Sequence, residues 1–264
     1  AKRTDYFSGG RTYYSHPSSN RADLPKIPHQ SSATGMQAIP ATGAAQGIQY
    51  RERFKLAEYK RGEEPLVLCS LGDGSVTEGE VSEALQMAVL HKYPIIYLVQ
   101  DNEWDISAHS SEIRAQDAPD FAKGFNGLKV ESIDGTDFVE CYETLSRVVN
   151  YVRTHRAPYL VHAKVPLLNH HTSGVRKEMY RPKDNLESDG LRDPFNRFKK
   201  YLLYEKISHA EELNAIEEEA RQLVKSDFER ALNEPNPTEE DLTTHIFAPT
   251  IFNEEKGERT PAGG

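Results

Sequence analysis

Short apolar runs alternate along the central part of the chain with longer stretches whose apolar residues recur at helical spacing. The runs 66–71, 95–99, 128–133 and 159–165 are largely apolar, which is typical of strands that are covered on both faces. Stretches of helical period separate most of these runs. This alternation predicts an α/β fold, in which a parallel sheet is covered by helices on both faces.

Polar residues indicate where the helices begin. Thr77-x-x-Glu80 and Ser208-x-x-Glu211 have the form of capping boxes, and Asp193-Pro194 supplies an N-cap followed by proline at the first helical position. In the first predicted helix, Gly43 and Gly47 would allow close packing. Pro166–Gly190 has no clear period, so a long functional loop is expected there. Helices are therefore expected from Met36 to about Arg53, after Thr77, over Asp137–His155, from Asp193, and from Ser208 to about Leu232.

Four segments are expected from these patterns. Residues 1–32 are rich in Ser, Gly, Pro, Tyr and charge, and they have no sustained period, which indicates irregular structure. Residues 33–206 form the predicted α/β domain, and 207–235 form a C-terminal helix. Residues 236–264 are proline-rich, polar and charged, which is typical of a tail or linker.

Composition narrows the class of protein. The formal net charge of −9 argues against nucleic acid as the main partner. Cys69 and Cys141 provide neither a disulfide framework nor zinc-ligand spacing. No apolar run is long enough to span a membrane, and no signal peptide is recognised. The expectation is a soluble protein of a reducing compartment, namely the cytoplasm, with the mitochondrial matrix as the other reading.

Two predicted strand ends carry groups that suit a magnesium–diphosphate ligand. Gly72-Asp73-Gly74 follows the first run, and Asn102 follows the second, 29 positions after Asp73. In open α/β sheets ligands bind at the carboxyl ends of the strands. Glycines let the backbone approach a phosphate, and Mg²⁺ prefers oxygen ligands such as carboxylate and amide oxygens. On its own, Asp-Gly would equally mark an ordinary turn.

The same residues resemble the thiamine-diphosphate motif of thiamine enzymes, which runs from Gly-Asp-Gly to an Asn just under thirty residues later. The flanking sequences 72–80, 101–107 and 192–203 resemble the alpha subunit of the decarboxylating component of 2-oxoacid dehydrogenase complexes, of the pyruvate and branched-chain type. Several separate motifs occur in the family's order. The resemblance covers nearly the whole chain, from Gly9 to about Asn236.

The resemblance implies thiamine diphosphate and Mg²⁺ as cofactors. It assigns Asp73, Asn102 and the backbone carbonyl of Trp104 to the metal. It implies a catalytic role for His171 together with His170, because a loop histidine of the family contacts the cofactor diphosphate; the alternative is an exposed pair without a role. Tyr180-Arg181 matches a Tyr-Arg pair that follows this histidine. The implied cofactor-binding residues are Thr34, Gly72, Asp73, Gly74, Ser75, Asn102, Trp104, Ile106 and His171, with Gln37 matching a glutamine of the segment around Thr34.

Three features depart from the family pattern. Asp105 stands where a small residue is usual, and its carboxylate would repel a diphosphate unless it points away. Leu167 stands where the family has an arginine before the histidine pair. The family's N-terminal helical region, with a Tyr-Arg pair that touches the diphosphate, precedes the part that this chain matches. The chain is therefore expected to be part of a longer polypeptide, fused to a beta-type domain or paired with a separate beta chain.

The implied activity is oxidative decarboxylation of a 2-oxoacid, with transfer of the acyl group to the lipoyl group of a partner acyltransferase. In this family the glutamate that activates the cofactor comes from the beta partner, so the chain should provide half of an active site. Two alternatives stay open: a transketolase-like thiamine enzyme, and a catalytically inactive regulatory subunit. The chain has neither G-x-G-x-x-G nor a P-loop motif, which argues against dinucleotide and P-loop nucleotide binding.

Overall fold

The computed structural model describes residues 2–3, 23–28, 32–172 and 174–243, together with the backbone of 250–253 and 258–261. The chain divides into two compact units, one of residues 33–214 and one of residues 1–32 with 215–264. Most of the predicted irregular segment 1–32 lies outside the described residues. The division into four predicted segments stays a prediction.

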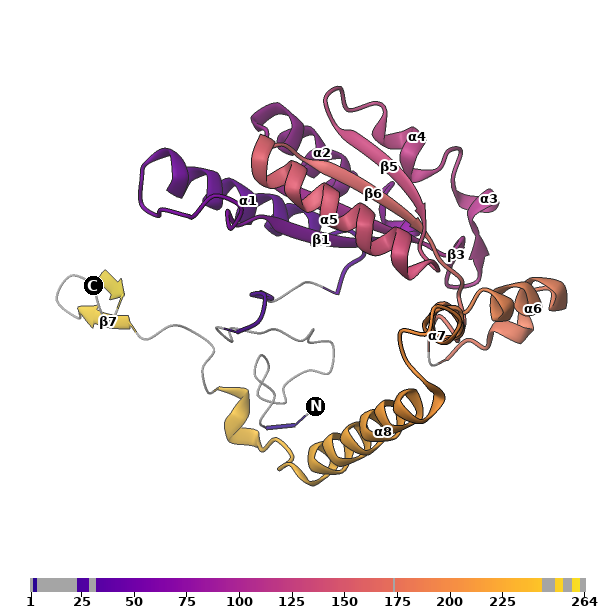
Figure 1. The fold of residues 1–264 in the computed structure, drawn as a ribbon. Helices are drawn as coiled ribbons and strands as arrows, with labels where there is room; N and C mark the ends of the chain where they lie inside the picture. Colours follow the sequence, from indigo (N-terminus) through magenta and orange to yellow (C-terminus); the bar gives the residue numbers. More distant parts are fainter. Residues whose placement is uncertain are drawn as a thin grey trace. The chain divides into compact units, whose positions relative to one another are not determined.

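A four-stranded parallel sheet forms the centre of the unit 33–214 (Figure 1). Its strands lie in the order β1-β2-β6-β5, and every neighbouring pair is parallel. A separate short ribbon, β3 (Trp104–Asp105) and β4 (Ala108–His109), is antiparallel. The sheet strands are β1 (Val67–Gly72), β2 (Ile95–Asp101), β5 (Lys129–Asp134) and β6 (Tyr159–Lys164).

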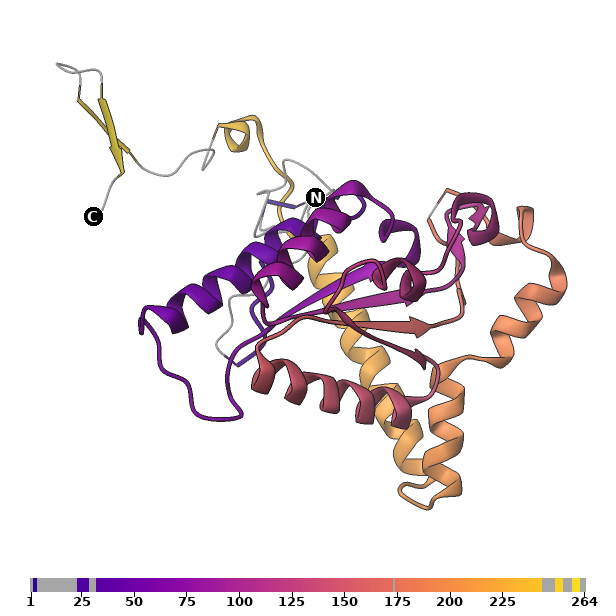
Figure 2. The same ribbon diagram turned by 90° about the horizontal axis from the view of Figure 1, so that it is seen from above.

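Helices cover both faces of this sheet, which confirms the predicted fold class (Figure 2). One face packs against α1 (Ala38–Arg53), α2 (Gly79–His91) and α4 (Ala118–Ala122). The other packs against α5 (Phe138–His155). Successive strand residues point to opposite faces, so both faces of each strand must be apolar. Cys69, Leu71 and Tyr97 belong to the first core, and Ile96, Val148 and Val161 to the second.

The predicted helix starts are partly confirmed. Asp137 caps α5 by accepting a hydrogen bond from the amide of Glu140, and Asp193 caps α7 (Pro194–Tyr204) by accepting one from Phe195. The capping box at Thr77 is wrong. The chain first makes a 3₁₀ turn, η1 (Asp73–Ser75), so α2 begins at Gly79 with Glu78 as its N-cap and without a side-chain cap.

The capping box expected before the last long helix is also wrong. This helix, α8 (Ala210–Asn233), starts two residues after Ser208. The Ser208 hydroxyl donates to the carboxylate of Glu212 at 2.6 Å, so its partner lies one residue beyond the predicted Glu211.

The segment 166–190 is not a loop throughout, so that prediction is wrong for its second half. A 3₁₀ turn, η2 (Lys177–Met179), is followed by the helix α6 (Lys183–Leu191). Polar contacts hold this region in place: the Arg181 guanidinium donates to Asp189, to Asn185 and to the carbonyl of Leu167. Such a helix has no apolar stripe, so hydrophobic periodicity could not reveal it.

The close packing expected at Gly43 and Gly47 is not found within the described part of the chain. A Cβ added at either glycine would meet no atom within 4 Å. The remaining helix of the unit 33–214 is α3 (Ser110–Ile113).

The second unit contains the greater part of α8, the 3₁₀ turn η3 (Glu239–Leu242) and a two-stranded antiparallel ribbon, β7 (Thr250–Asn253) with β8 (Glu258–Pro261). Its two chain segments are joined by hydrogen bonds from the Lys2 ammonium to the carbonyls of Leu232 and Glu234. Arg3 forms an ion pair with Asp241 at 3.0 Å. The role of 236–264 as a linker stays a prediction.

Candidate functional site

The ends of β1 and β2 place two polar turns side by side. Gly72 pairs with Gln100 in the parallel register, so Asp73 and Asn102 leave the sheet at neighbouring points of one edge. The Ser75 hydroxyl donates to the Gly72 carbonyl at 2.7 Å and closes the 3₁₀ turn. This turn leaves Asp73 only 3% exposed. The proximity of the two strand ends that the sequence predicts is confirmed.

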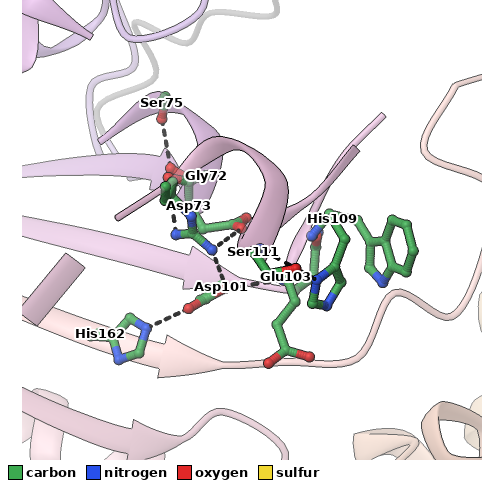
Figure 3. Close-up of polar contacts among 11 residues, drawn as sticks. Gly72, Asp73, Ser75, Asp101, Glu103, His109, Ser111 and His162 are labelled. Carbon is green, nitrogen blue, oxygen red and sulfur yellow. Dashed lines mark hydrogen bonds and ion pairs between the residues drawn. The ribbon is translucent and has the colours of Figure 1, made fainter. Parts of the chain in front are cut away.

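A buried arginine holds Asp73. The Arg114 guanidinium lies 3.0 Å from the Asp73 carboxylate and 3.6 Å from that of Asp101. The other carboxylate oxygen of Asp101 lies 2.8 Å from Nε2 of His162, on β6. Figure 3 shows this network, which runs from His162 through Asp101 to Asp73. All four side chains are at most 4% exposed. Buried charges of this kind are stable only when they are paired.

The two carboxyl groups have opposite pKa shifts. Burial and the neighbouring carboxylate of Asp101 raise the pKa of Asp73 to about 6, against the opposing effect of Arg114. Burial acts in the same direction on Asp101, but the hydrogen bonds from His162 and the Glu103 amide, together with Arg114, lower its pKa well below the ordinary value. Of these two carboxyl groups, Asp101 is therefore the more stably ionised, and the charge of Asp73 is the less compensated, although both lie beside Arg114.

The β2–β3 turn fixes Asn102 and Trp104. The Asn102 side-chain carbonyl accepts a hydrogen bond from the Trp104 amide at 2.9 Å, and Asp101 accepts one from the Glu103 amide at 3.0 Å. Glu103 and Ile106 adopt positive φ angles of 67° and 55°. An amide oxygen that accepts one hydrogen bond keeps a second lone pair, so Asn102 can still bind a cation.

Trp104 is buried in a cluster of aromatic and cationic side chains. The centroid of its indole ring lies 5.0 Å from that of His109 and 5.3 Å from that of Tyr180, and the Arg181 guanidinium lies 5.3 Å from the same ring. Arg181 also donates a hydrogen bond to Asp189 on α6, so its contact with the indole ring links the second half of the 166–190 segment to the β2–β3 turn. The Tyr180-Arg181 pair is therefore brought to the candidate site.

Apart from Nη2 of Arg114, which forms the ion pairs with Asp73 and Asp101, three buried polar atoms near these turns have no hydrogen-bond partner among the described residues. They are Nε1 of Trp104, Nε of Arg114 and the hydroxyl of Tyr180. A buried donor without an acceptor costs free energy, so such atoms often mark a missing ligand or water. All three can donate to an anion, and this chemistry fits a phosphate-bearing cofactor.

The donor set for a metal is limited to a few oxygen atoms. No cluster of three or more His, Cys, Asp or Glu side chains that could hold a metal occurs in the described ranges. A cation would therefore depend on the Asp73 carboxylate with the amide oxygen of Asn102 and a backbone carbonyl. Mg²⁺ is commonly bound by one or two carboxylates and completes its shell with phosphate and water, so this set fits it.

The glycines of the first turn differ in what covers them. A Cβ at Gly72 would meet nothing within 4 Å, so its backbone is open to a ligand. A Cβ at Gly74 would lie 2.9 Å from Cγ and Oδ2 of Asp105. Asp105 thus points towards the glycine turn and not away from it, which answers the question that the sequence left open.

The segment around Thr34 reaches the same turn. Gly35, at a φ of 81°, lies against the Cβ of Glu78 and the carbonyl of Ser75. The side-chain amide of Gln37 donates to the Ser70 carbonyl at 3.0 Å. Thr34, the residue before Gly35, is itself exposed.

The two loop histidines stand apart from these contacts. His170 and His171 are exposed, and Nδ1 of His170 accepts a hydrogen bond from the Lys177 amide. Within the described residues, no hydrogen bond or ion pair joins either histidine to Asp73, Asn102 or Trp104. Their catalytic and cofactor-binding roles stay predictions, as does the role of Ile106, which is 43% exposed.

Sequence reasoning missed four residues of this region: Asp101, Arg114, His162 and Asp189. His162 did carry a signal, because a histidine inside a continuously apolar strand requires a hydrogen-bond partner when it is buried. Arg114 carried no local signal, since its partner Asp73 lies 41 positions away.

No helix in the described part of the chain is long and apolar enough to cross a membrane.

Comparison with known proteins gives one consistent family. The family model described as "Dehydrogenase E1 component" matches residues 5–240. The pyruvate dehydrogenase E1 component subunit alpha of Rickettsia bellii is 31% identical over 193 residues, which cover 72% of this chain and 58% of the relative. That of Porphyra purpurea is 32% identical over 214 residues, covering 80% and 61%. The chloroplastic alpha-3 subunit of Arabidopsis thaliana is 31% identical over 218 residues, covering 80% and 49%.

Proposed function

The chain belongs to the dehydrogenase E1 component family, and from this premise we propose that it is the cofactor-binding alpha part of a 2-oxoacid dehydrogenase. The relatives named above are pyruvate dehydrogenase alpha subunits, and the chain spans about half to three-fifths of their length. The activity, substrate and partners of the whole protein are therefore part of the proposal. Pyruvate or a branched-chain 2-oxoacid is the proposed substrate.

One observation carries the proposal. A buried carboxylate, Asp73, and a side-chain amide, Asn102, leave the sheet at the ends of two neighbouring parallel strands, beside a glycine whose backbone is open. This edge is where open α/β sheets bind ligands. Members of this family generally depend on thiamine diphosphate, and the oxygen donors of the edge suit the magnesium ion that accompanies its diphosphate.

Each residue has a proposed task. Asp73, Asn102 and the carbonyl of Trp104 would hold Mg²⁺, while Gly72 and Ser75 would line the diphosphate. Thr34 would face the remainder of the cofactor, because its segment packs on the same turn. The buried donors of Arg114 and Trp104 would supply positive potential there. Bound thiamine diphosphate would supply the electron sink that decarboxylation of a 2-oxoacid requires.

The active site is proposed to be completed by a partner. Asp73, Asp101 and Asp105 lie at these turns and would face the proposed metal and diphosphate. The activating glutamate would come from a beta-type subunit or a fused beta domain. The acyl group would pass to a lipoyl-bearing acyltransferase, in the cytoplasm or the mitochondrial matrix.

The test is a binding titration of the 264-residue chain. The sequence contains a single tryptophan, Trp104, which lies at the proposed site, so its fluorescence reports binding directly. Thiamine diphosphate should change this fluorescence in the presence of Mg²⁺ and much less in its absence. Asp73→Asn should abolish the magnesium dependence, whereas the control Asp120→Asn, on the exposed ion pair with Lys123, should behave as the wild type.

A second measurement separates the alternatives. Decarboxylation of a panel of 2-oxoacids, measured with an artificial electron acceptor, should be negligible for the chain alone and should appear when a beta-type partner is added. Turnover by the chain alone would refute the half-site assignment. Cofactor binding without turnover in the reconstituted complex would favour the inactive regulatory subunit, and transfer between sugar phosphates would favour the transketolase-like enzyme.

A further inference from the structure

The space above Gly74 is occupied by the carboxyl group of Asp105. A Cβ built on Gly74 would lie 2.9 Å from both Cγ and Oδ2 of Asp105 and 3.1 Å from its Cβ. The two distances of 2.9 Å are shorter than real Cβ contacts, so any other residue at position 74 would require the Asp105 carboxylate to shift. Gly72 and Gly79, at the two ends of the same segment, have nothing within 4 Å of a built Cβ. Asp105 therefore covers Gly74, whereas Gly72 and Gly79 stay open.

The short β3–β4 ribbon holds Asp105 in this position. Neighbouring residues of a strand point to opposite sides, and Trp104 is buried between His109 and Tyr180. Asp105 must then face the other side, where the glycine turn lies. It pairs with Ala108 across the ribbon, and Ile106 makes the tight turn between them with a φ of 55°. The carboxylate is thus directed by a buried anchor and not by a flexible loop.

The charge of Asp105 is not compensated within the described residues. It forms no ion pair and no hydrogen bond there, whereas the Arg114 guanidinium is shared between Asp73 and Asp101. Asp105 is a half-buried carboxylate that lies against the glycine turn, the part of the site at which the diphosphate is proposed to bind. Two negative groups cannot share this position without a cation between them.

We propose that Asp105 is a built-in anion that competes with the cofactor diphosphate at Gly74, and that it makes diphosphate binding depend steeply on the concentration of a divalent cation. This inference rests on the proposed function, because it concerns the same site. Asp105 would thereby determine how tightly the cofactor binds. The metal then has two tasks, which are to bind the diphosphate and to screen this carboxylate.

The test uses matched variants of the full chain and the fluorescence of Trp104. Asp105→Asn keeps the shape and removes the charge, whereas Asp105→Ala removes both. Asp120→Asn, on α4, makes the same chemical change at an exposed carboxylate that pairs with Lys123 away from the turn. Each variant is titrated with thiamine diphosphate and, separately, with inorganic pyrophosphate, at several Mg²⁺ concentrations. Thermal unfolding of each variant is measured in parallel.

At low Mg²⁺, Asp105→Asn should bind thiamine diphosphate about tenfold more tightly than the wild type, which is the effect of a single repulsive charge at short range in a partly solvated site. Asp105→Ala should gain at least as much, and Asp120→Asn should equal the wild type. The gain should shrink as Mg²⁺ approaches saturation. Pyrophosphate should follow the same order, because the effect concerns only the diphosphate.

Failure of this inference and failure of the proposed function give different results. If the wild type binds and Asp105→Asn binds equally or more weakly at every Mg²⁺ concentration, the competition is refuted and the proposed function stands. If neither the wild type nor any Asp105 variant binds thiamine diphosphate or pyrophosphate with Mg²⁺, both are overturned.

Discussion

Replacing Arg114 by methionine should destabilise the unit 33–214 strongly. The guanidinium is 3.0 Å from Asp73 and 3.6 Å from Asp101, and all three side chains are at most 4% exposed. Methionine fills a similar volume but leaves two buried carboxylates without their cation. Removing one partner of a buried ion pair costs about 3–5 kcal/mol, a large part of the roughly 5–15 kcal/mol that stabilises a typical domain.

The assay is urea unfolding followed by the fluorescence of Trp104, which lies in this unit. Arg147→Met is the matched control: Arg147 pairs with Glu131 at 2.8 Å, but its side chain is 57% exposed. Exposed pairs contribute little, so this variant should unfold close to the wild type. Arg114→Lys keeps the charge and should fall between the two.

A double variant tests whether the loss comes from charge. Adding Asp73→Asn to Arg114→Met removes one of the two orphaned carboxylates and leaves Asp101 with its remaining partner, His162. The double variant should therefore be more stable than Arg114→Met alone. If Arg114→Met unfolded at the same urea concentration as Arg147→Met, the argument that burial makes this pair essential would be wrong.

Three other features of the unit 33–214 give measurable outcomes. Burial acts to raise the pKa of Asp134, but hydrogen bonds from Thr136 and Arg197 outweigh it and lower this pKa to about 2. The ionised carboxylate therefore stabilises the fold above its ordinary pKa of 3.8, and this stabilisation is lost as the pH falls through 2. The difference in unfolding free energy between the wild type and Arg197→Gln should accordingly shrink as the pH falls from 5 through 2. Burial raises the pKa of Cys69 to about 12, so mass spectrometry should find this thiol unalkylated by iodoacetamide in the native protein at pH 8. Arg181→Met should speed tryptic cleavage after Arg176 and shift the emission of Trp104 to the red, because Arg181 joins Leu167, Asp189 and the indole ring; unchanged cleavage and emission would contradict this role.

The sheet could be predicted because buried parallel strands have to be apolar on both faces. The run 128–133 corresponds to β5 at Lys129–Asp134, and 95–99 lies inside β2. The order of the strands in the sheet needs long-range pairing, which apolar patterning does not contain. β6 lies between β2 and β5 although it is the last of the four in the chain.

The site could be predicted only where it is built from local turns. Asp73 and Asn102 follow strand ends directly, so their proximity results from the parallel register alone. Arg114 reaches Asp73 from a separate segment between β4 and α4, and its importance comes from burial, which a sequence does not display. The helix α6 could not be predicted either, because a buried ion pair between Arg181 and Asp189 holds it in place of the apolar stripe that marks most helices.

The metal site is the central claim, and locating the metal tests it most directly. Crystals of the chain grown with thiamine diphosphate and Mn²⁺ in place of Mg²⁺ would show the ion by its anomalous scattering. The expected result is a single strong peak bounded by the Asp73 carboxylate, the side-chain oxygen of Asn102 and the carbonyl of Trp104. Thiamine diphosphate bound away from Gly72, or bound at the turn with no peak at Asp73, would contradict the account.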